Sequence, residues 1–163
     1  MYAAPDTATI RVGNTRVLIA VRAPGKKIRA SEIAGEMAAV LKAQGEYLGG
    51  KLPVDKYAFL FCFAAEGEGI SGASGALEHS YSSVYFLPEM DLPSIKQMLR
   101  DVTAHEFFHI ITPLTIHSEE IGDFSFNTPR MSKHLWLYEG CTEYAAGHVQ
   151  VREGQSVRGV ARR

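Results

Sequence analysis

Two histidines four residues apart, with a glutamate directly after the first, occur in HEFFH, residues 105–109. Positions four apart are neighbours on one face of a helix, so the imidazoles of His105 and His109 can bind one metal ion. Glu106 lies one step further round, where its carboxylate reaches a water molecule at that ion rather than the ion itself. The pattern predicts metal-assisted hydrolysis with Glu106 as general base. The alternative is a helix with two surface histidines.

A third metal ligand is expected in LWLYEGCTEY, residues 135–144. Glu139 stands among apolar residues, where burying a carboxylate would be costly, and a ligand role would explain it. Glu143 follows four residues later on the same helical face. It can accept the second N–H of a ligand histidine and so fix the orientation of the ring. For Glu143, an ordinary exposed helix carboxylate is an equal alternative.

These side chains require two helices. Asp91 is a suitable cap, a proline suited to the first helical turn follows it, apolar residues recur at helical spacing, and Pro113 ends the run. The stretch from Ser132 to Val149 begins with a second cap residue and again has helical apolar spacing. Within it, Gly140 suits close packing on another helix, although glycine costs about 1 kcal/mol there against alanine.

The N-terminal part of the chain predicts a hairpin and a further helix. Residues 7–22 contain β-branched runs broken at Gly13-Asn14, a turn pair between two strands. Apolar residues recur at helical spacing from Ala30 to Tyr47, and a glycine pair closes that segment.

The middle of the chain predicts two more strands. KYAFLFCFAA, residues 56–65, is nearly all apolar and aromatic, which is typical of a strand buried on both faces. A flexible glycine-rich loop is expected over residues 67–75 and a strand from His79 to Leu87. No repeat or internal linker is present, so the loop is expected to form part of the site.

The composition is that of one globular domain. A chain of 163 residues with 46% hydrophobic content can bury one core. The net charge of −1 gives no general attraction to nucleic acid or an anionic membrane. The basic end, VREGQSVRGVARR, is expected to be frayed, with a docking segment as the alternative. The longest apolar run, residues 57–65, is too short to span a bilayer. A soluble chain is expected, with Cys62 and Cys141 as buried free thiols that leave the compartment open.

A third stretch, GALEH at residues 75–79, strengthens the resemblance of these motifs to a known family. HEFFH, followed thirty residues after its second histidine by the glutamate of LWLYEGCTEY, resembles the gluzincin metallopeptidases. The resemblance is closest to the glycyl aminopeptidase family, whose members often carry a PDZ domain. GALEH is similar to the G-G-L-E-H stretch of that family and to the G-A-M-E-N stretch of the membrane alanyl aminopeptidases.

The resemblance implies a role for each matching position. In those relatives the two histidines and the later glutamate bind zinc, and the glutamate after the first histidine is the general base. The Gly-x-x-Glu stretch borders the peptide substrate, and its glutamate binds the free amino end. By position this assigns zinc to His105, His109 and Glu139, catalysis to Glu106, and substrate binding to Gly75, Ala76 and Glu78. His79 either orients Glu78 or satisfies the end of a strand.

The implied fold is α+β, a thermolysin-like zincin catalytic core in which a small sheet packs on the H-E-x-x-H helix and the third-ligand helix. Residues 1–163 would form a single core that lacks the downstream helical subdomain, as a fragment of a longer multidomain peptidase. The group that supports the oxyanion would lie in that later part. Tyr138 and Tyr144 are internal stand-ins that we expect to pack the core instead, and His117 and His134 are expected at the surface.

The function expected is zinc-dependent, aminopeptidase-like hydrolysis of peptide bonds, with a metal-activated water and a glutamate base. A strand at a sheet edge would hold a peptide with a free N-terminus through backbone hydrogen bonds. The alternative is a catalytically incomplete module that binds zinc and peptide. Both interpretations share the metal ligands, so turnover separates them.

Overall fold

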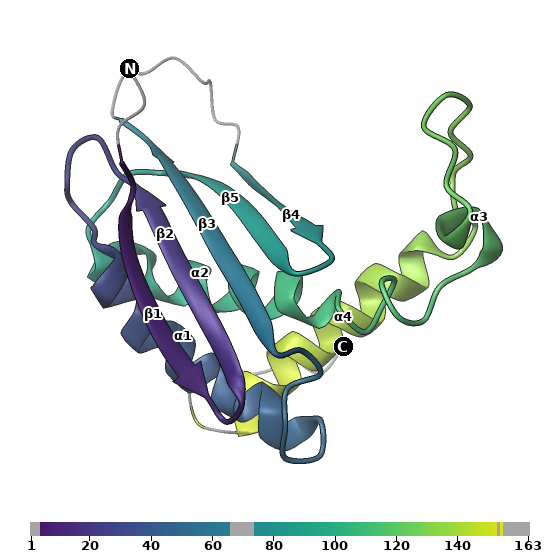
Figure 1. The fold of residues 1–163 in the computed structure, drawn as a ribbon, viewed down its shortest axis with the longest axis horizontal. Helices are drawn as coiled ribbons and strands as arrows, with labels where there is room; N and C mark the ends of the chain where they lie inside the picture. Colours follow the sequence, from purple (N-terminus) through teal and green to yellow (C-terminus); the bar gives the residue numbers. More distant parts are fainter. Residues whose placement is uncertain (1–3, 66–73, 153, 155–163) are drawn as a thin grey trace, which may run out of the picture.

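The computed structural model describes residues 4–65, 74–152 and 154. Within these residues one five-stranded sheet carries helices against one of its faces (Figure 1). This agrees with the predicted α+β class. None of the helices that the structure describes is long and apolar enough to cross a membrane. Most of the basic C-terminal end, and most of the glycine-rich loop, lie outside the described residues.

The strand order in the sheet is β1-β2-β3-β5-β4. Strand β1 (Asp6–Val12) is antiparallel to β2 (Thr15–Arg22), so the predicted hairpin is confirmed. Gly13 in its two-residue turn has φ +56°, a conformation that glycine adopts without steric cost. Strands β2, β3 (Lys56–Ala64) and β5 (Ser82–Pro88) are parallel neighbours. Strand β4 (Gly75–His79) pairs antiparallel with β5 and forms an edge of the sheet.

The prediction of one strand from His79 to Leu87 is wrong, because that stretch contains a chain reversal. His79 pairs with Ser82, and the two residues between them form a tight turn. GALEH is therefore itself the edge strand β4, rather than the end of a loop that precedes a strand. The edge strand thus contains Glu78, two residues before the turn.

Strand β3 is buried on one face only, which corrects the prediction of burial on both faces. Its buried positions alternate with half-buried ones, and the buried side chains are Tyr57, Phe59, Phe61 and Phe63. Helix α1 (Ala30–Tyr47), which has the predicted bounds, and helix α2 (Leu92–Phe108) cover that face (Figure 1). The core forms between these two helices and the sheet.

Helix α4 (Leu135–Arg152) packs against α2 and α1 (Figure 1). The main contacts of α4 are thus with these two helices, and the packing of the sheet on the third-ligand helix stays a prediction. The short helix α3 (Glu119–Gly122) lies in the segment that leads into α4.

Three further local predictions need correction. Helix α4 begins after the predicted cap, and the hydroxyl of Ser132 accepts the N–H of His134 at 3.1 Å instead. Gly140 is exposed, and a Cβ there would meet nothing within 4 Å among the described residues, so it does not serve close helix packing. Cys62 and Cys141 are free, but Cys62 is only half-buried and Cys141 is exposed.

Candidate metal and catalytic site

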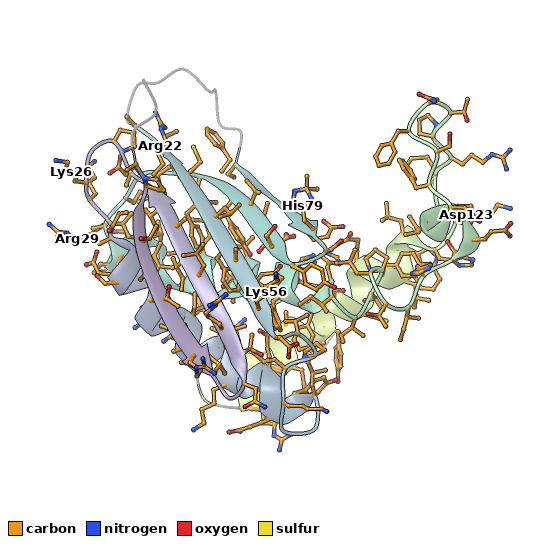
Figure 2. All side chains as sticks on the ribbon, in the orientation of Figure 1. Arg22, Lys26, Arg29, Lys56, His79 and Asp123 are labelled. Atoms are coloured by element: carbon orange, nitrogen blue, oxygen red, sulfur yellow. The ribbon has the colours of Figure 1, made fainter. Side chains whose placement is uncertain are left out.

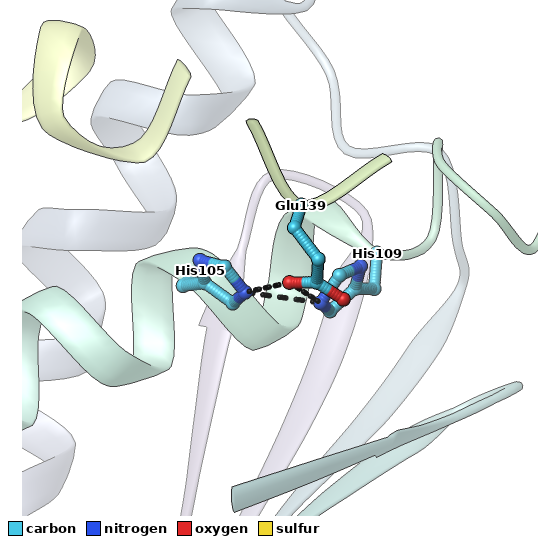
Figure 3. A group of neighbouring side chains, drawn as sticks. All are labelled: His105, His109 and Glu139. Atoms are coloured by element: carbon cyan, nitrogen blue, oxygen red, sulfur yellow. Dashed lines mark hydrogen bonds and ion pairs between the residues drawn. The ribbon is translucent and has the colours of Figure 1, made fainter. Parts of the chain in front are cut away.

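Helix α2 presents both histidines of HEFFH on one face. The helix ends at Phe108, and His109 follows as the C-terminal cap residue with helical dihedrals, φ −60° and ψ −16°. The four-residue spacing therefore keeps its helical geometry. The Nε2 atoms of His105 and His109 lie 3.1 Å apart, with the two ring planes at 81° (Figure 3). Both ring nitrogens are thus directed at one point in space.

Helix α4 brings Glu139 to the same point from the other side (Figure 3). Its Oε2 atom lies 3.1 Å from Nε2 of His105 and 3.7 Å from Nε2 of His109. The sequence singled out Glu139 as a carboxylate that would be costly to bury, and that reason was wrong, because its side chain is 47% exposed. Its apolar neighbours Leu135 and Trp136 are exposed as well. The structure places Glu139 beside the two histidines, but burial does not explain why a carboxylate stands there.

The remaining nitrogen of each imidazole has a partner that only accepts hydrogen bonds. Nδ1 of His109 donates to the carbonyl oxygen of Thr112 at 2.8 Å. Nδ1 of His105 donates to Oε2 of Glu143 at 3.0 Å. These contacts place a proton on Nδ1 of each neutral ring, which leaves both Nε2 lone pairs directed at Glu139. Glu143 makes its contact although its side chain is 78% exposed.

Three acceptor atoms therefore face one another at close range, an arrangement that is repulsive unless a proton or a cation lies between them. The three separations define a point roughly 1.9 Å from each atom, close to the ~2.0–2.1 Å at which zinc binds imidazole nitrogen and carboxylate oxygen. Two imidazoles and one carboxylate are also a donor set that zinc accepts. The residues present fit a zinc ion.

Glu106 lies beside this cluster in a buried position. The residue is buried, and its Oε2 atom has no hydrogen-bond partner among the described residues. Burial, the largest cause, acts together with the charges of Glu78 and Glu139 against the opposing charge of His109, and the net effect raises the pKa of this carboxyl to about 7. A carboxyl with a pKa in that range takes up and releases a proton near neutral pH.

Edge strand β4 contributes Glu78. One carboxylate oxygen of Glu78, one of Glu106 and a ring nitrogen of His109 all lie within 4.8 Å of one another. Two carboxylates therefore lie on the side of the cluster that borders the sheet. Gly75 and Ala76 begin the same strand, paired with residues of β5. His79 ends β4 at the surface (Figure 2).

The other singled-out residues do not belong to the group formed by His105, His109 and Glu139. Tyr138 is buried, as expected, and its hydroxyl accepts the N–H of Ser118 at 2.7 Å. Tyr144 is 67% exposed and stacks on His148, so the expectation that it packs the core is wrong. His117 and His134 are exposed, as expected.

Sequence reasoning missed two residues next to the site, Thr112 and Thr142. Thr112 supplies the carbonyl that holds His109, and its hydroxyl lies 3.1 Å from the hydroxyl of Thr142 on α4. Threonines in a connecting segment and inside a helix have no pattern that distinguishes them from ordinary ones. Only the fold brings them together.

The fold is shared with an aminopeptidase. The crystal structure of an aminopeptidase N family protein from Idiomarina loihiensis superposes with a TM-score of 0.70 at 18% sequence identity. The match covers 91% of this chain and 25% of that one. The chain thus spans about a quarter of the length of the structure it matches.

The family model of the M61 glycyl aminopeptidases matches residues 98–159. That segment contains HEFFH and the glutamate of LWLYEGCTEY, so the resemblance to this family is confirmed where the three proposed ligands lie. GALEH lies outside the matched segment. No curated protein matches the chain.

Proposed function

We propose that the chain binds zinc through His105, His109 and Glu139 and hydrolyses peptide bonds, as the core of an aminopeptidase-like enzyme. One observation carries the proposal: three acceptor atoms from two helices converge on a point that suits zinc. The match to the glycyl aminopeptidase model supports the same assignment over the same residues.

Zinc, when bound, polarises the scissile carbonyl and lowers the pKa of water, so that attack proceeds near neutral pH. The protein's own groups do the rest. Glu106 accepts a proton from the attacking water and passes it to the leaving amine. Its buried setting, which raises its pKa, favours this exchange, although a cation in the site would pull the pKa of Glu106 down again.

Two hydrogen bonds keep the metal-binding nitrogens free. Glu143 holds Nδ1 of His105, and the Thr112 carbonyl holds Nδ1 of His109. Each ring is thus fixed in the tautomer whose Nε2 atom accepts, which is the form that binds a metal. Glu143 therefore acts on the site without touching the ion.

Edge strand β4 provides the substrate platform. Its hydrogen-bonding edge away from β5 is available for an extended peptide to pair as a further strand. Glu78 then receives the α-ammonium group of that peptide through a charge-assisted hydrogen bond. Because Glu78 lies so close to Glu106 and His109, the cut falls next to the N-terminus, which makes the activity that of an aminopeptidase.

A second candidate is a zinc- and peptide-binding module without turnover. It is favoured by the positions of the two tyrosines considered as oxyanion supports. The Tyr138 hydroxyl accepts the Ser118 N–H, and Tyr144 stacks on His148 at the surface. Neither contact brings a tyrosine hydroxyl to the three converging atoms, so an oxyanion donor is expected from another group.

The test is turnover by the zinc-loaded chain on short peptides with free or N-acetylated ends. We expect release of the N-terminal residue from free peptides only. Glu46→Gln, a change at an exposed glutamate of α1, is the control and should keep wild-type rates. Zinc binding without any hydrolysis would favour the binding module, and hydrolysis without zinc would overturn both candidates.

A further inference from the structure

We propose that Thr142 is a positioning residue that holds the second ligand histidine, His109, through Thr112. The proposal rests on the proposed function, in which these helices bind zinc. The hydrogen bonds of Thr142 lead to Thr112 and to neither of the two histidines. It acts instead on the carbonyl group that fixes one of them.

The contacts form a chain from one ligand helix to the other. Thr142 lies in α4 three residues after Glu139, and it is 2% exposed. Its hydroxyl oxygen lies 3.1 Å from the hydroxyl oxygen of Thr112 and 3.5 Å, a long contact, from the Thr112 carbonyl oxygen. That same carbonyl accepts the Nδ1–H of His109 at 2.8 Å. We call these two threonines the threonine clamp.

The clamp matters because Thr112 lies where regular structure has ended. Helix α2 stops at Phe108, and residues 110–115 form turns. The backbone N–H of Thr112 reaches the Phe108 carbonyl only at 3.4 Å, which is a weak bond. Backbone hydrogen bonds of the neighbouring residues hold the turns, and the contact with Thr142 is the one that reaches Thr112 from α4.

This carbonyl decides which nitrogen of His109 carries the proton. A displaced carbonyl allows the proton to move to Nε2, and an Nε2–H cannot bind a metal. The clamp thus ties the tautomer of His109 to the placement of the helix that carries Glu139. One buried side chain couples two of the three proposed ligands.

Thr103 provides a matched control. It is buried to the same degree, at 1% exposed, and lies in α2. Its hydroxyl donates to the Leu99 carbonyl within its own helix. A change from threonine to valine therefore removes one buried hydroxyl in each case, but only at Thr142 does the hydroxyl lead to His109.

The experiment compares the variants Thr142→Val, Thr112→Val, the double variant and Thr103→Val by zinc competition with a chelating dye. Loss of the clamp should weaken zinc binding about tenfold, at the low end of the ~10–100-fold seen when a partner of a ligand histidine is removed directly. The double variant should lose no more than either single one, because both remove the same contact. Thr142→Ser, which keeps the hydroxyl, should restore binding.

A second readout needs no metal. Nitrogen-15 NMR of the imidazoles in the metal-free chain at pH 8 should show His109 with its proton on Nδ1 in the wild type and in Thr103→Val. In Thr142→Val and Thr112→Val the signal should move toward the other tautomer.

Equal zinc affinities and equal tautomers in all variants would overturn the proposal, as would the same loss of affinity in Thr103→Val. Absence of zinc binding in the wild type would instead defeat the proposed function. The tautomer measurement would then still decide whether Thr142 positions His109.

Discussion

The ion pairs of Glu36 offer the sharpest test of how the two helices on the sheet are held. Glu36 in α1 accepts from Arg100 of α2, with the Nε atom at 2.8 Å and a second guanidinium nitrogen at 2.6 Å from one carboxylate oxygen. Its other oxygen lies 2.8 Å from Nζ of Lys96. The side chains of Glu36 and Arg100 are only 15% and 17% exposed, so solvent screens the pair weakly.

The expected loss in Glu36→Gln follows from these exposures. A hydrogen bond to a charged group contributes about 1.5–3 kcal/mol, and the more exposed Lys96 pair adds about 0.2–1 kcal/mol. We expect the free energy of unfolding to fall by about 1.7–4 kcal/mol at pH 7. The control is Glu46→Gln, which removes an exposed pair with Lys42 at 4.0 Å and should cost roughly 0.3–0.5 kcal/mol.

The loss should also depend on pH. Burial raises the pKa of Glu36, but the hydrogen bonds and charges of Lys96 and Arg100 outweigh it, so the pKa is lowered overall. The folded chain then binds fewer protons than the unfolded chain in this range, and the stabilisation is complete above the unfolded pKa of about 4.3. It is lost as the pH falls through the lower, folded pKa.

Urea unfolding of the metal-free chain, followed by circular dichroism between pH 7 and about pH 3, measures both effects. The difference between wild type and Glu36→Gln should be full at pH 7 and shrink toward the acid end. A loss at pH 7 no larger than that of Glu46→Gln, or a difference that grows as the pH falls, would refute the reasoning.

Three further predictions concern the site. Glu106→Gln should keep its zinc and lose ~10²–10⁴-fold in turnover, measured by metal analysis and peptide hydrolysis, and loss of zinc would make Glu106 structural instead. Glu78→Ala should slow cleavage of free-amino peptides by roughly 10–150-fold, while equal wild-type rates on N-acetylated peptides would contradict the aminopeptidase assignment. Glu143→Ala should weaken zinc binding by ~10–100-fold in a dye competition, and unchanged affinity would make it an ordinary exposed carboxylate.

Short sequence patterns predicted the elements whose form depends on residues that are close together in the chain. The β1-β2 hairpin follows from Gly13-Asn14, and the bounds of α1 follow from the spacing of its apolar side chains. The reversal between β4 and β5 was missed because Ser80 and Tyr81 lie within a β-favouring run without a glycine or asparagine to mark the turn. Burial was misjudged on β3, since a sequence does not show which face the helices will cover.

Only the residues within recognisable sequence motifs of the site could be predicted. His105 and His109 follow from their spacing on one helix, whereas Glu139 was reached through an argument from burial that does not hold. Its true setting depends on how α4 crosses α2, which is a long-range property. The contact between Thr112 and Thr142 also depends on how α4 crosses α2, and no sequence pattern indicates it.

The most direct test of the central claim is zinc stoichiometry and affinity in the wild type and in Glu139→Ala, with His117→Ala as the control. His117 is an exposed histidine outside the cluster. We predict about one zinc per wild-type chain and wild-type zinc affinity in the control. In Glu139→Ala we predict that zinc affinity falls by more than about a hundredfold. Removal of a direct ligand should cost more than the ~10–100-fold seen when a hydrogen-bond partner of a ligand is removed. Full affinity in Glu139→Ala, or no zinc in the wild type, would contradict the account.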